Sequence, residues 1–168
     1  MSLRSLQRFL YGLRNAVRPR RKPRVQRPPD PRVDADPWLA SMLDELGERY
    51  QLGGDLPDGI QLLRRTGRAR FNPMRVYLRP ADRQVSGDYD VRARDGKTLD
   101  DGRALLERKV TSQLASLGLK PARETVEEWG GQVITRRYEG RCPDARTAAA
   151  AVRFICEQSE QVMDTAAE

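Results

Sequence analysis

The chain of 168 residues contains no histidine. Histidine is the usual general base, the commonest metal ligand and the side chain that titrates near neutral pH, so the chemistry that depends on imidazole is excluded. A serine or cysteine nucleophile also has no histidine to activate it. This absence favours a protein that binds over one that catalyses. We therefore predict a non-enzymatic protein without a cofactor.

Cysteine is scarce as well, with Cys142 and Cys156 fourteen residues apart and no C-x-x-C spacing. The interpretation we favour is a pair of reduced, buried thiols, while a disulfide stays open because the sequence does not give their separation. Long apolar runs are missing too. No stretch approaches the roughly 18 residues of a transmembrane helix, and the apolar stretch near the N-terminus ends at Arg14, so no secretory leader is predicted.

Acidic residues are absent from the first 29 positions, where arginine is abundant. Residues 1–36 contain ten basic and three acidic residues, and this difference of +7 is the net charge of the whole protein. Residues 37–168 hold the other 21 basic and 21 acidic residues and are neutral. The basic character therefore belongs to an N-terminal extension, and the domain behind it is not by itself a polyanion binder.

Two different segments precede the predicted domain. Residues 1–17 have the pattern of a basic amphipathic helix, because leucines recur at spacings of three and four along one face. The apolar docking face predicted for this helix consists of Leu3, Leu6, Phe9, Leu10 and Leu13. Residues 18–35 are rich in proline and arginine, which predicts a stiff, extended linker.

The folded domain is predicted to span residues 36–168. Asp36 followed by Pro37 indicates the start of a helix that continues to about Tyr50. Turn residues are expected over 52–59, and extended segments around 60–63, 74–79 and 84–91. In the last of these, Val85, Gly87, Tyr89 and Val91 alternate with Ser86, Asp88 and Asp90, so each set takes one face of a strand.

The second half of the domain begins with another helix. Thr98 and Asp101 have the spacing of a capping box, and the helix stops at Gly118. Gly130 and Gly131 separate two extended runs, 123–129 and 132–138, in the manner of a hairpin. Asp144 is expected to cap the last helix. The order αβββαββα predicts a single α+β domain with an antiparallel sheet of about five strands packed by three helices.

This order of elements resembles the secretion-chaperone-like fold, which small dimeric binding proteins use. Its first part, αβββα, resembles a double-stranded-RNA-binding domain in outline. In that family the second helix opens with a lysine-rich segment that meets phosphates, whereas the stretch from Thr98 to Arg103 is acidic here. No sequence motif supports either resemblance, and we assign no family.

Asp88 and Asp90 resemble part of a metal-binding cluster with Asp95, Asp100 and Asp101. An EF-hand loop does not fit, because Arg92 and Leu99 would stand at two of its ligand positions. A nuclease-like set with Glu107 and Lys109 does not fit a helical pattern, because residues i and i+2 do not share a helix face. We interpret the aspartates as a solvated strand face and predict no metal site. A metal-dependent enzyme is the most distant alternative.

Arginines form a second basic group between residues 64 and 83, with Phe71 and Tyr77 among them. On the strand at 74–79, Arg75, Tyr77 and Arg79 share one face, which could hold phosphates and stack bases. An ordinary solvated face balanced by Glu127 and Glu128 is the competing interpretation. The residues predicted to bind an anionic partner are Arg18, Arg20, Arg21, Lys22, Arg24, Arg27, Arg64, Arg65, Arg68, Arg70, Arg75 and Arg79.

We expect a non-enzymatic binding or assembly subunit of a larger protein or ribonucleoprotein complex. Its N-terminal extension would dock on nucleic acid or on an acidic protein surface. The alternative is a peripheral membrane adaptor whose N-terminal helix binds anionic lipid. A homodimer is compatible with either function. The expected location is cytoplasmic, or the mitochondrial matrix if the acid-free N-terminal stretch is a presequence.

Overall fold

The computed structural model describes residues 28–66, 70–93, 96–128, 131–159 and 163–164. The predicted N-terminal helix, with its docking face at Leu3, Leu6, Phe9, Leu10 and Leu13, lies outside these ranges. The linker residues Arg18, Arg20, Arg21, Lys22, Arg24 and Arg27 also lie outside them, as does Arg68. Predictions about these residues stay predictions.

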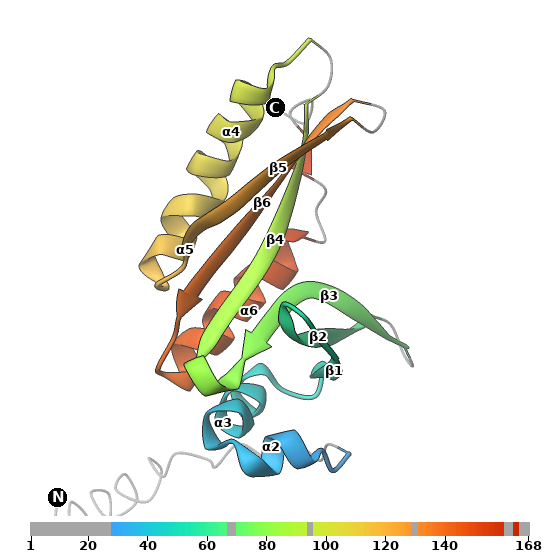
Figure 1. The fold of residues 1–168 in the computed structure, drawn as a ribbon, viewed down its shortest axis with the longest axis vertical. Coiled ribbons are helices and arrows are strands. Elements are labelled where there is room, and N and C mark those ends of the chain that lie inside the picture. The colour runs from blue at the N-terminus through green and yellow to red at the C-terminus, as the bar shows by residue number, and fades with distance from the viewer. Residues whose placement is uncertain (1–27, 67–69, 94–95, 129–130, 160–162, 165–168) are drawn as a thin grey trace, which may run out of the picture.

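The predicted α+β class and the antiparallel sheet are confirmed (Figure 1). The helical elements are α2 (Pro31–Ala35), α3 (Pro37–Leu46), η1 (Pro80–Asp82), α4 (Leu99–Leu106), η2 (Glu107–Thr111), α5 (Ser112–Ser116) and α6 (Ala145–Ser159). The strands are β1 (Tyr50–Leu56), β2 (Gly59–Thr66), β3 (Arg70–Arg79), β4 (Gln84–Ala93), β5 (Lys120–Glu128), β6 (Gln132–Arg141) and β7 (Met163–Asp164). Six strands form the sheet in the order β1-β2-β3-β4-β6-β5, and β7 pairs in parallel with the end of β4.

The additional strand is β1, which replaces most of the turn that we predicted over 52–59. Tyr50 and Leu52 point inward and are buried, and the strand pairs antiparallel with β2. The two glycines that suggested a turn lie at a register shift between Leu52 and Asp55. At Gly53 a Cβ atom would come within 3.0 Å of the Gln61 carbonyl oxygen, so a glycine lets the two strands approach closely there.

Helix caps occur where the sequence predicts them. The Asp36 carboxylate accepts a hydrogen bond from the backbone N–H of Leu39 at 2.9 Å, with Pro37 at the first helical position. Thr98 and Asp101 form the predicted capping box at the start of α4. At α6 the carboxylate of Asp144 accepts from the N–H of Thr147 at 2.8 Å. These bonds satisfy backbone donors that a helix leaves without an internal partner.

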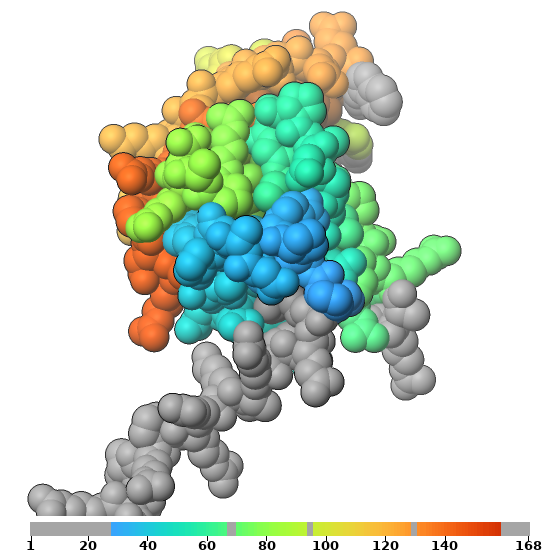
Figure 2. All heavy atoms as spheres, turned by 60° about the horizontal axis from the view of Figure 1, so that its bottom comes forward, coloured from blue at the N-terminus to red at the C-terminus, as the bar shows by residue number. Residues whose placement is uncertain are grey.

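The end of the predicted linker is helical rather than extended. Pro31–Ala35 forms α2, whose first turn is capped by Asp30. The Arg32 guanidinium donates to the carbonyl oxygen of Gly53 at 2.9 Å and to the Asp55 carboxylate at 2.8 Å, which holds α2 against β1. In Figure 2, α2 and α3 lie together across one end of the molecule in blue and cyan.

The core lies between the sheet and helices α3, α4 and α6, which share one face. A Cβ atom at Gly87 of β4 would approach the Ile155 side chain of α6 to 2.8 Å, and one at Gly102 of α4 would approach Ile134 of β6 to 3.0 Å. The two faces predicted for β4 are confirmed, with Val85, Tyr89 and Val91 buried toward the helices. The opposite face is not solvated as we expected, because Ser86 and Asp88 are also buried. In Figure 1, α6 lies behind the long strands β4 and β6.

The two thiols, Cys142 and Cys156, are free and buried, as we predicted. The backbone around Cys142 also anchors α3, since the indole N–H of Trp38 donates to the Cys142 carbonyl oxygen at 2.8 Å. Within the described residues no helix has the length and apolar character needed to cross a lipid bilayer.

Candidate functional site: the open face of the sheet

The face of the sheet opposite the helices is polar and hollowed. None of the helices in the described part of the chain lies on it, and we call it the open face. Strand alternation turns the polar residues of β3, β4, β5 and β6 toward this side. They enclose a hollow of about 390 Å³, which is lined by Arg75, Asp88, Asp90, Arg92, Arg123, Thr125, Glu127, Val133, Thr135 and Arg137.

Arg137 of β6 is the centre of the polar network in the hollow. Its Nε donates to Oδ1 of Asp88 at 2.7 Å, and its Nη1 lies 2.8 Å from Oδ1 of Asp58. The guanidinium also lies over the ring of Tyr77, 5.2 Å from its centroid. Asp58 lies between β1 and β2, so the sheet curls enough for this connection to reach β6. The hydrogen bonds that Arg137 donates to Asp88 and Asp58 raise its pKa, so the guanidinium stays charged.

Arg75 of β3 holds the second carboxylate of the hollow. It forms an ion pair with Asp90 and lies 3.6 Å from Asp88. The hydroxyl of Thr135 donates to Oδ1 of Asp90 at 2.7 Å. The Asp88 side chain is only 8% exposed, and its burial is matched by two arginines. Both aspartates therefore form ion pairs with arginines.

The strand β5 contributes the rim of the hollow, with Arg123, Thr125 and Glu127 on the open face. Arg123 and Glu127 are both exposed, and neither forms an ion pair with another residue in the described part of the chain. The positive charge of Arg123 contributes to the lowered pKa of Asp58, although the hydrogen bond from Arg137 is the largest cause. These rim charges are available to a partner, unlike those of Asp88 and Asp90.

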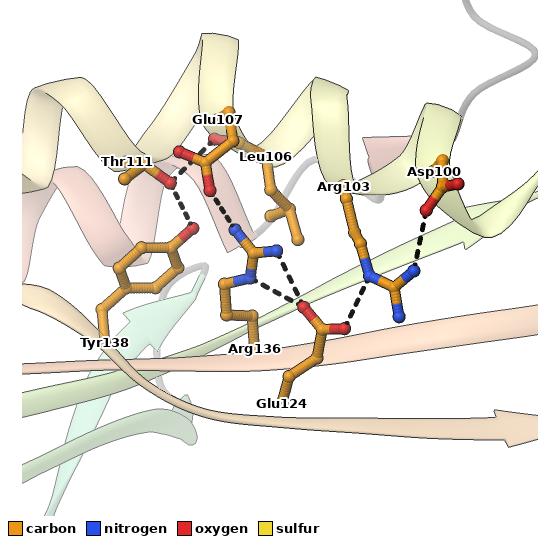
Figure 3. Close-up of polar contacts among 8 residues, drawn as sticks. All are labelled: Asp100, Arg103, Leu106, Glu107, Thr111, Glu124, Arg136 and Tyr138. Carbon is orange, nitrogen blue, oxygen red and sulfur yellow. Dashed lines mark hydrogen bonds and ion pairs between the residues drawn. The ribbon is translucent and has the colours of Figure 1, made fainter.

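The helix-covered face has an arginine network of its own (Figure 3). Arg136 of β6 points toward α4 and η2 and is 8% exposed. Its Nη1 donates to Glu107 at 2.6 Å and its Nη2 to Glu124 of β5 at 2.8 Å. Glu124 also accepts from Nε of Arg103 at 2.9 Å. Although burial alone would raise the pKa of Glu124, the hydrogen bonds from these arginines lower it.

A turn of π-helix lies directly above this network. The hydroxyl of Thr111 donates to the carbonyl oxygen of Leu106 at 3.4 Å, five residues earlier, and lies 2.8 Å from the hydroxyl of Tyr138. Such wide turns often mark functional sites. Here, however, the surrounding polar atoms bind one another, and Arg136 at the centre of the network is buried (Figure 3). We therefore assign the Arg136 network to stability, and the open face is the candidate site.

The residues predicted from the second basic group are divided between the two faces. Arg75, Tyr77 and Arg79 share the open face, while Val76 and Leu78 are buried on the other, as predicted. Arg64 instead turns toward the helices, where its guanidinium lies 5.8 Å from the centroid of the Tyr50 ring and donates to the Cys156 carbonyl oxygen at 3.3 Å.

Arg65 and Arg70 lie at the far end of the β2–β3 pair, where Arg70 is opposite Thr66. The predicted basic surface is therefore not continuous. Arg75 is in addition balanced by Asp88 and Asp90, and not by Glu127 and Glu128 as in the competing interpretation. Whether any of these arginines binds an anionic partner stays a prediction.

Asp88 and Asp90, the pair behind the metal-dependent alternative, are both held by arginine. Within the described residues no group of three or more histidine, cysteine, aspartate or glutamate side chains is placed to hold a metal ion.

Sequence reasoning missed Arg92, Arg123, Thr135 and Arg137, although alternation along 132–138 places Thr135 and Arg137 on one face. The missing information was the pairing of β4 with β6, which are separated by α4, α5 and β5. That pairing brings Arg137 directly opposite Asp88.

Comparison with known proteins gives no relative, since no family model, no curated protein and no solved structure matches the chain. The element order that we compared with secretion chaperones and double-stranded-RNA-binding domains has three strands before the middle helix. The described part of this chain has four strands, β1 to β4, before α4.

Proposed function

We propose that the protein is a non-enzymatic binding subunit that holds an acidic segment of a partner protein on the open face of its sheet. The supporting observation is the hollow of about 390 Å³, of whose lining residues only Val133 is apolar. Pockets for small organic ligands are lined mostly by apolar and aromatic side chains. A hollow lined by arginines, carboxylates and threonines suits a polar, extended partner better.

The charges in the hollow favour a polypeptide over a nucleic acid. Four arginines are interspersed with Asp88, Asp90 and Glu127. A phosphate backbone carries negative charge at every nucleotide and would meet these carboxylates along with the arginines. A polypeptide can place a single carboxylate beside Arg123 and a basic or hydroxyl group beside Glu127. Such alternating complementarity is typical of protein interfaces.

The N-terminal extension is the second contact in this proposal. Residues 1–36 hold the entire net charge of +7, which would draw an acidic protein toward the domain by long-range attraction. In this role Arg18, Arg20, Arg21, Lys22, Arg24 and Arg27 increase the rate of association, and the open face supplies selectivity. The same charge supports the alternative in which the extension binds RNA or DNA and joins the domain to a ribonucleoprotein assembly.

The test compares three anionic probes on the full chain: a peptide of alternating glutamate and serine, a single-stranded RNA, and vesicles that contain phosphatidylglycerol. We expect the peptide to bind and the Arg75→Gln variant to weaken that binding at least about fivefold. Arg146→Gln is the matched control, because Arg146 is exposed at the start of α6 on the helix-covered side.

If Arg75→Gln and Arg146→Gln change peptide binding equally, the proposal for the open face is wrong. Strong binding of RNA or vesicles with no binding of the peptide would instead support the nucleic-acid or membrane alternative.

A further inference from the structure

The last strand of the sheet, β5, has one edge beside which no strand of the described residues lies. The sheet order ends at β5, which pairs with β6 along its other edge. Backbone N–H and C=O groups on a free edge are a ready template for another strand. Pro121 lacks an N–H, and the register shifts between Pro121 and Arg123. The regular part of the edge therefore begins after Pro121 and continues to Glu128.

The side chains on this edge carry two charges of opposite sign that cannot neutralise each other. Arg123 and Glu127 point to the open face and are four residues apart, which is about 13 Å along a strand. Neither forms an ion pair within the described part of the chain. Thr125 lies midway between them on the same face. Along β5 the open face thus carries a positive charge, a hydroxyl and a negative charge in this order. An antiparallel copy of the strand carries them in the reverse order.

We propose that β5 pairs antiparallel with β5 of a second copy of this chain, with Thr125 opposite Thr125 of the second copy. This arrangement places Arg123 of each copy opposite Glu127 of the other and creates two cross-strand ion pairs. Opposite charges and paired threonines in these positions stabilise an antiparallel pair. The interaction goes beyond the proposed binding function, because it needs no ligand on the open face.

Charge selects this register among those that symmetry allows. In a symmetric pair of β5 strands, a two-fold axis runs perpendicular to the sheet. It must pass beside a residue and not between two residues, because side chains directly opposite each other lie on the same face of the sheet. An axis beside Arg123, Glu124, Glu127 or Glu128 would place that charge opposite its own copy. An axis beside Ala122 would pair the regular part of the strand with the irregular end at Pro121 and the residues before it. An axis beside Val126 would place Glu124 opposite Glu128 twice. The axis beside Thr125 avoids every like-charge pair and forms two opposite-charge pairs.

Pairing would also complete the candidate site. Arg123, Thr125 and Glu127 line the rim of the hollow in each copy, so the two hollows would meet at the two-fold axis and form one longer polar groove. On the helix-covered side Val126, which is 42% exposed, would lie opposite Glu124 of the second copy. Val126 would then be partly covered by the aliphatic part of that side chain.

The edge of one strand buries less surface than a typical stable interface, so the dimer is expected to be weak, with a dissociation constant of about 1–100 µM. Sedimentation velocity of the full chain over a concentration series measures it. Arg123→Glu places glutamate opposite Glu127 twice and should raise the dissociation constant about tenfold or more. Glu127→Arg should do the same, because arginine then faces Arg123.

The double variant Arg123→Glu with Glu127→Arg restores both ion pairs with the opposite polarity. It should recover association close to that of the unmodified chain, which a general change of surface charge would not do. Arg141→Glu is the control, because Arg141 is exposed at the end of β6 and away from the free edge.

Cysteine substitution tests the register directly. Thr125→Cys should give a disulfide-linked dimer under mild oxidation, because residues directly opposite on antiparallel strands have Cβ atoms about 5 Å apart. Glu127→Cys should not, because its own copy would lie about 13 Å away along the strands. The unmodified chain is the baseline, since its two thiols are buried.

A chain that stays monomeric up to about 1 mM overturns the proposal. So does a dimer whose dissociation constant the single and double charge variants leave unchanged. These outcomes are separate from those of the peptide titration, in which Arg75 and not the β5 edge is altered. If the chain is a monomer that binds the peptide through Arg75, the proposed function stands and the proposed β5 pairing is wrong.

Discussion

Arg136 and Arg137 are neighbours on β6, yet they lie on opposite faces of the sheet and have different roles. Arg136 is 8% exposed under α4 and η2, where Glu107 and Glu124 surround it. Arg137 lies in the open hollow, where it holds Asp88 and Asp58 and stacks on Tyr77. The first cross-links the helices to the sheet, whereas the second shapes a surface that a partner can reach.

Residue type alone therefore does not identify a binding residue in this protein. Both arginines are paired with two carboxylates, and both have a raised pKa. Only their surroundings separate them, because no helix of the described residues covers the face of Arg137. The comparison predicts that changes on the helix-covered face act on stability and that changes on the open face act on binding.

The largest expected effect on stability is that of Arg136→Ala. The substitution removes three hydrogen bonds, two to Glu124 and one to Glu107, and leaves Glu124 with Arg103 alone. We therefore expect a loss of about 3 kcal/mol in the free energy of unfolding. Urea unfolding followed by circular dichroism measures it. Arg137→Ala should cost about half as much, because Arg75 still lies beside Asp88. Equal losses in the free energy of unfolding for Arg136→Ala and Arg137→Ala would contradict the distinction between the two faces.

Adjacent positions on β4 give a smaller contrast. Gly87→Ala pushes a methyl group into the Ile155 side chain of α6, and such overpacking costs about 1–2 kcal/mol. Ser86 is also buried, on the side of the open face. Ser86→Ala removes only a long hydrogen bond of 3.4 Å to the Tyr77 carbonyl oxygen, and should lower the free energy of unfolding by about 0.5 kcal/mol. Thermal melting of the two variants tests this contrast, and the reverse order would contradict it.

Acid should affect the helix-covered face more strongly than the open one. The folded-state pKa of Glu124 is lower than its ordinary value of 4.5. Its contribution to stability is therefore fully present above pH 4.5 and is lost as the pH falls through the lowered pKa. Glu124→Gln should destabilise the protein at neutral pH, and the difference from the unmodified chain should shrink below pH 4.5.

The pKa of Asp58 is also lowered, chiefly by the hydrogen bond from Arg137. Its side chain is 47% exposed, and solvent screening weakens such pairs. Asp58→Asn should therefore lower the free energy of unfolding at neutral pH by less than Glu124→Gln does. Urea titrations at several pH values compare the two variants, and a larger pH effect for Asp58→Asn would invert the comparison.

The smallest expected effect on stability belongs to Arg123→Ala at the rim of the hollow. Arg123 is exposed and forms no ion pair within the described residues, so the free energy of unfolding should change by less than about 0.5 kcal/mol. The same variant should weaken binding of the acidic peptide. A loss of stability above about 1 kcal/mol would mean that the open face is structural as well.

Much of the fold follows from local patterns in the sequence. Asp36, Thr98 and Asp144 begin helices because their side chains satisfy backbone donors nearby, and the alternation along 84–91 assigns the two faces of β4 correctly. The β1 strand was missed because Gly53 and Gly54 suggest a turn locally. Their role is to allow close approach at a register shift with β2, which a single segment does not show.

The candidate site was harder to predict, because it depends on strands that are distant in the sequence. Arg75 and Asp90 are fifteen residues apart, and Asp88 and Arg137 forty-nine. The sequence suggested a solvated face for the aspartates and no metal site, but it did not identify the arginines that lie opposite them. Arg64 and Arg75 looked like one patch, but the alternation of β2 and β3 places them on opposite faces.

The most direct test of the binding surface is a nuclear magnetic resonance titration of the full chain with the acidic peptide, in which the Nε–H signals of the arginines are followed. Our account predicts that the signals of Arg75, Arg123 and Arg137 shift with increasing peptide, while those of Arg103 and Arg136 stay in place. If the signals of Arg103 and Arg136 shift instead, or if no signal from the open face moves at saturating peptide, the open face is not the binding surface.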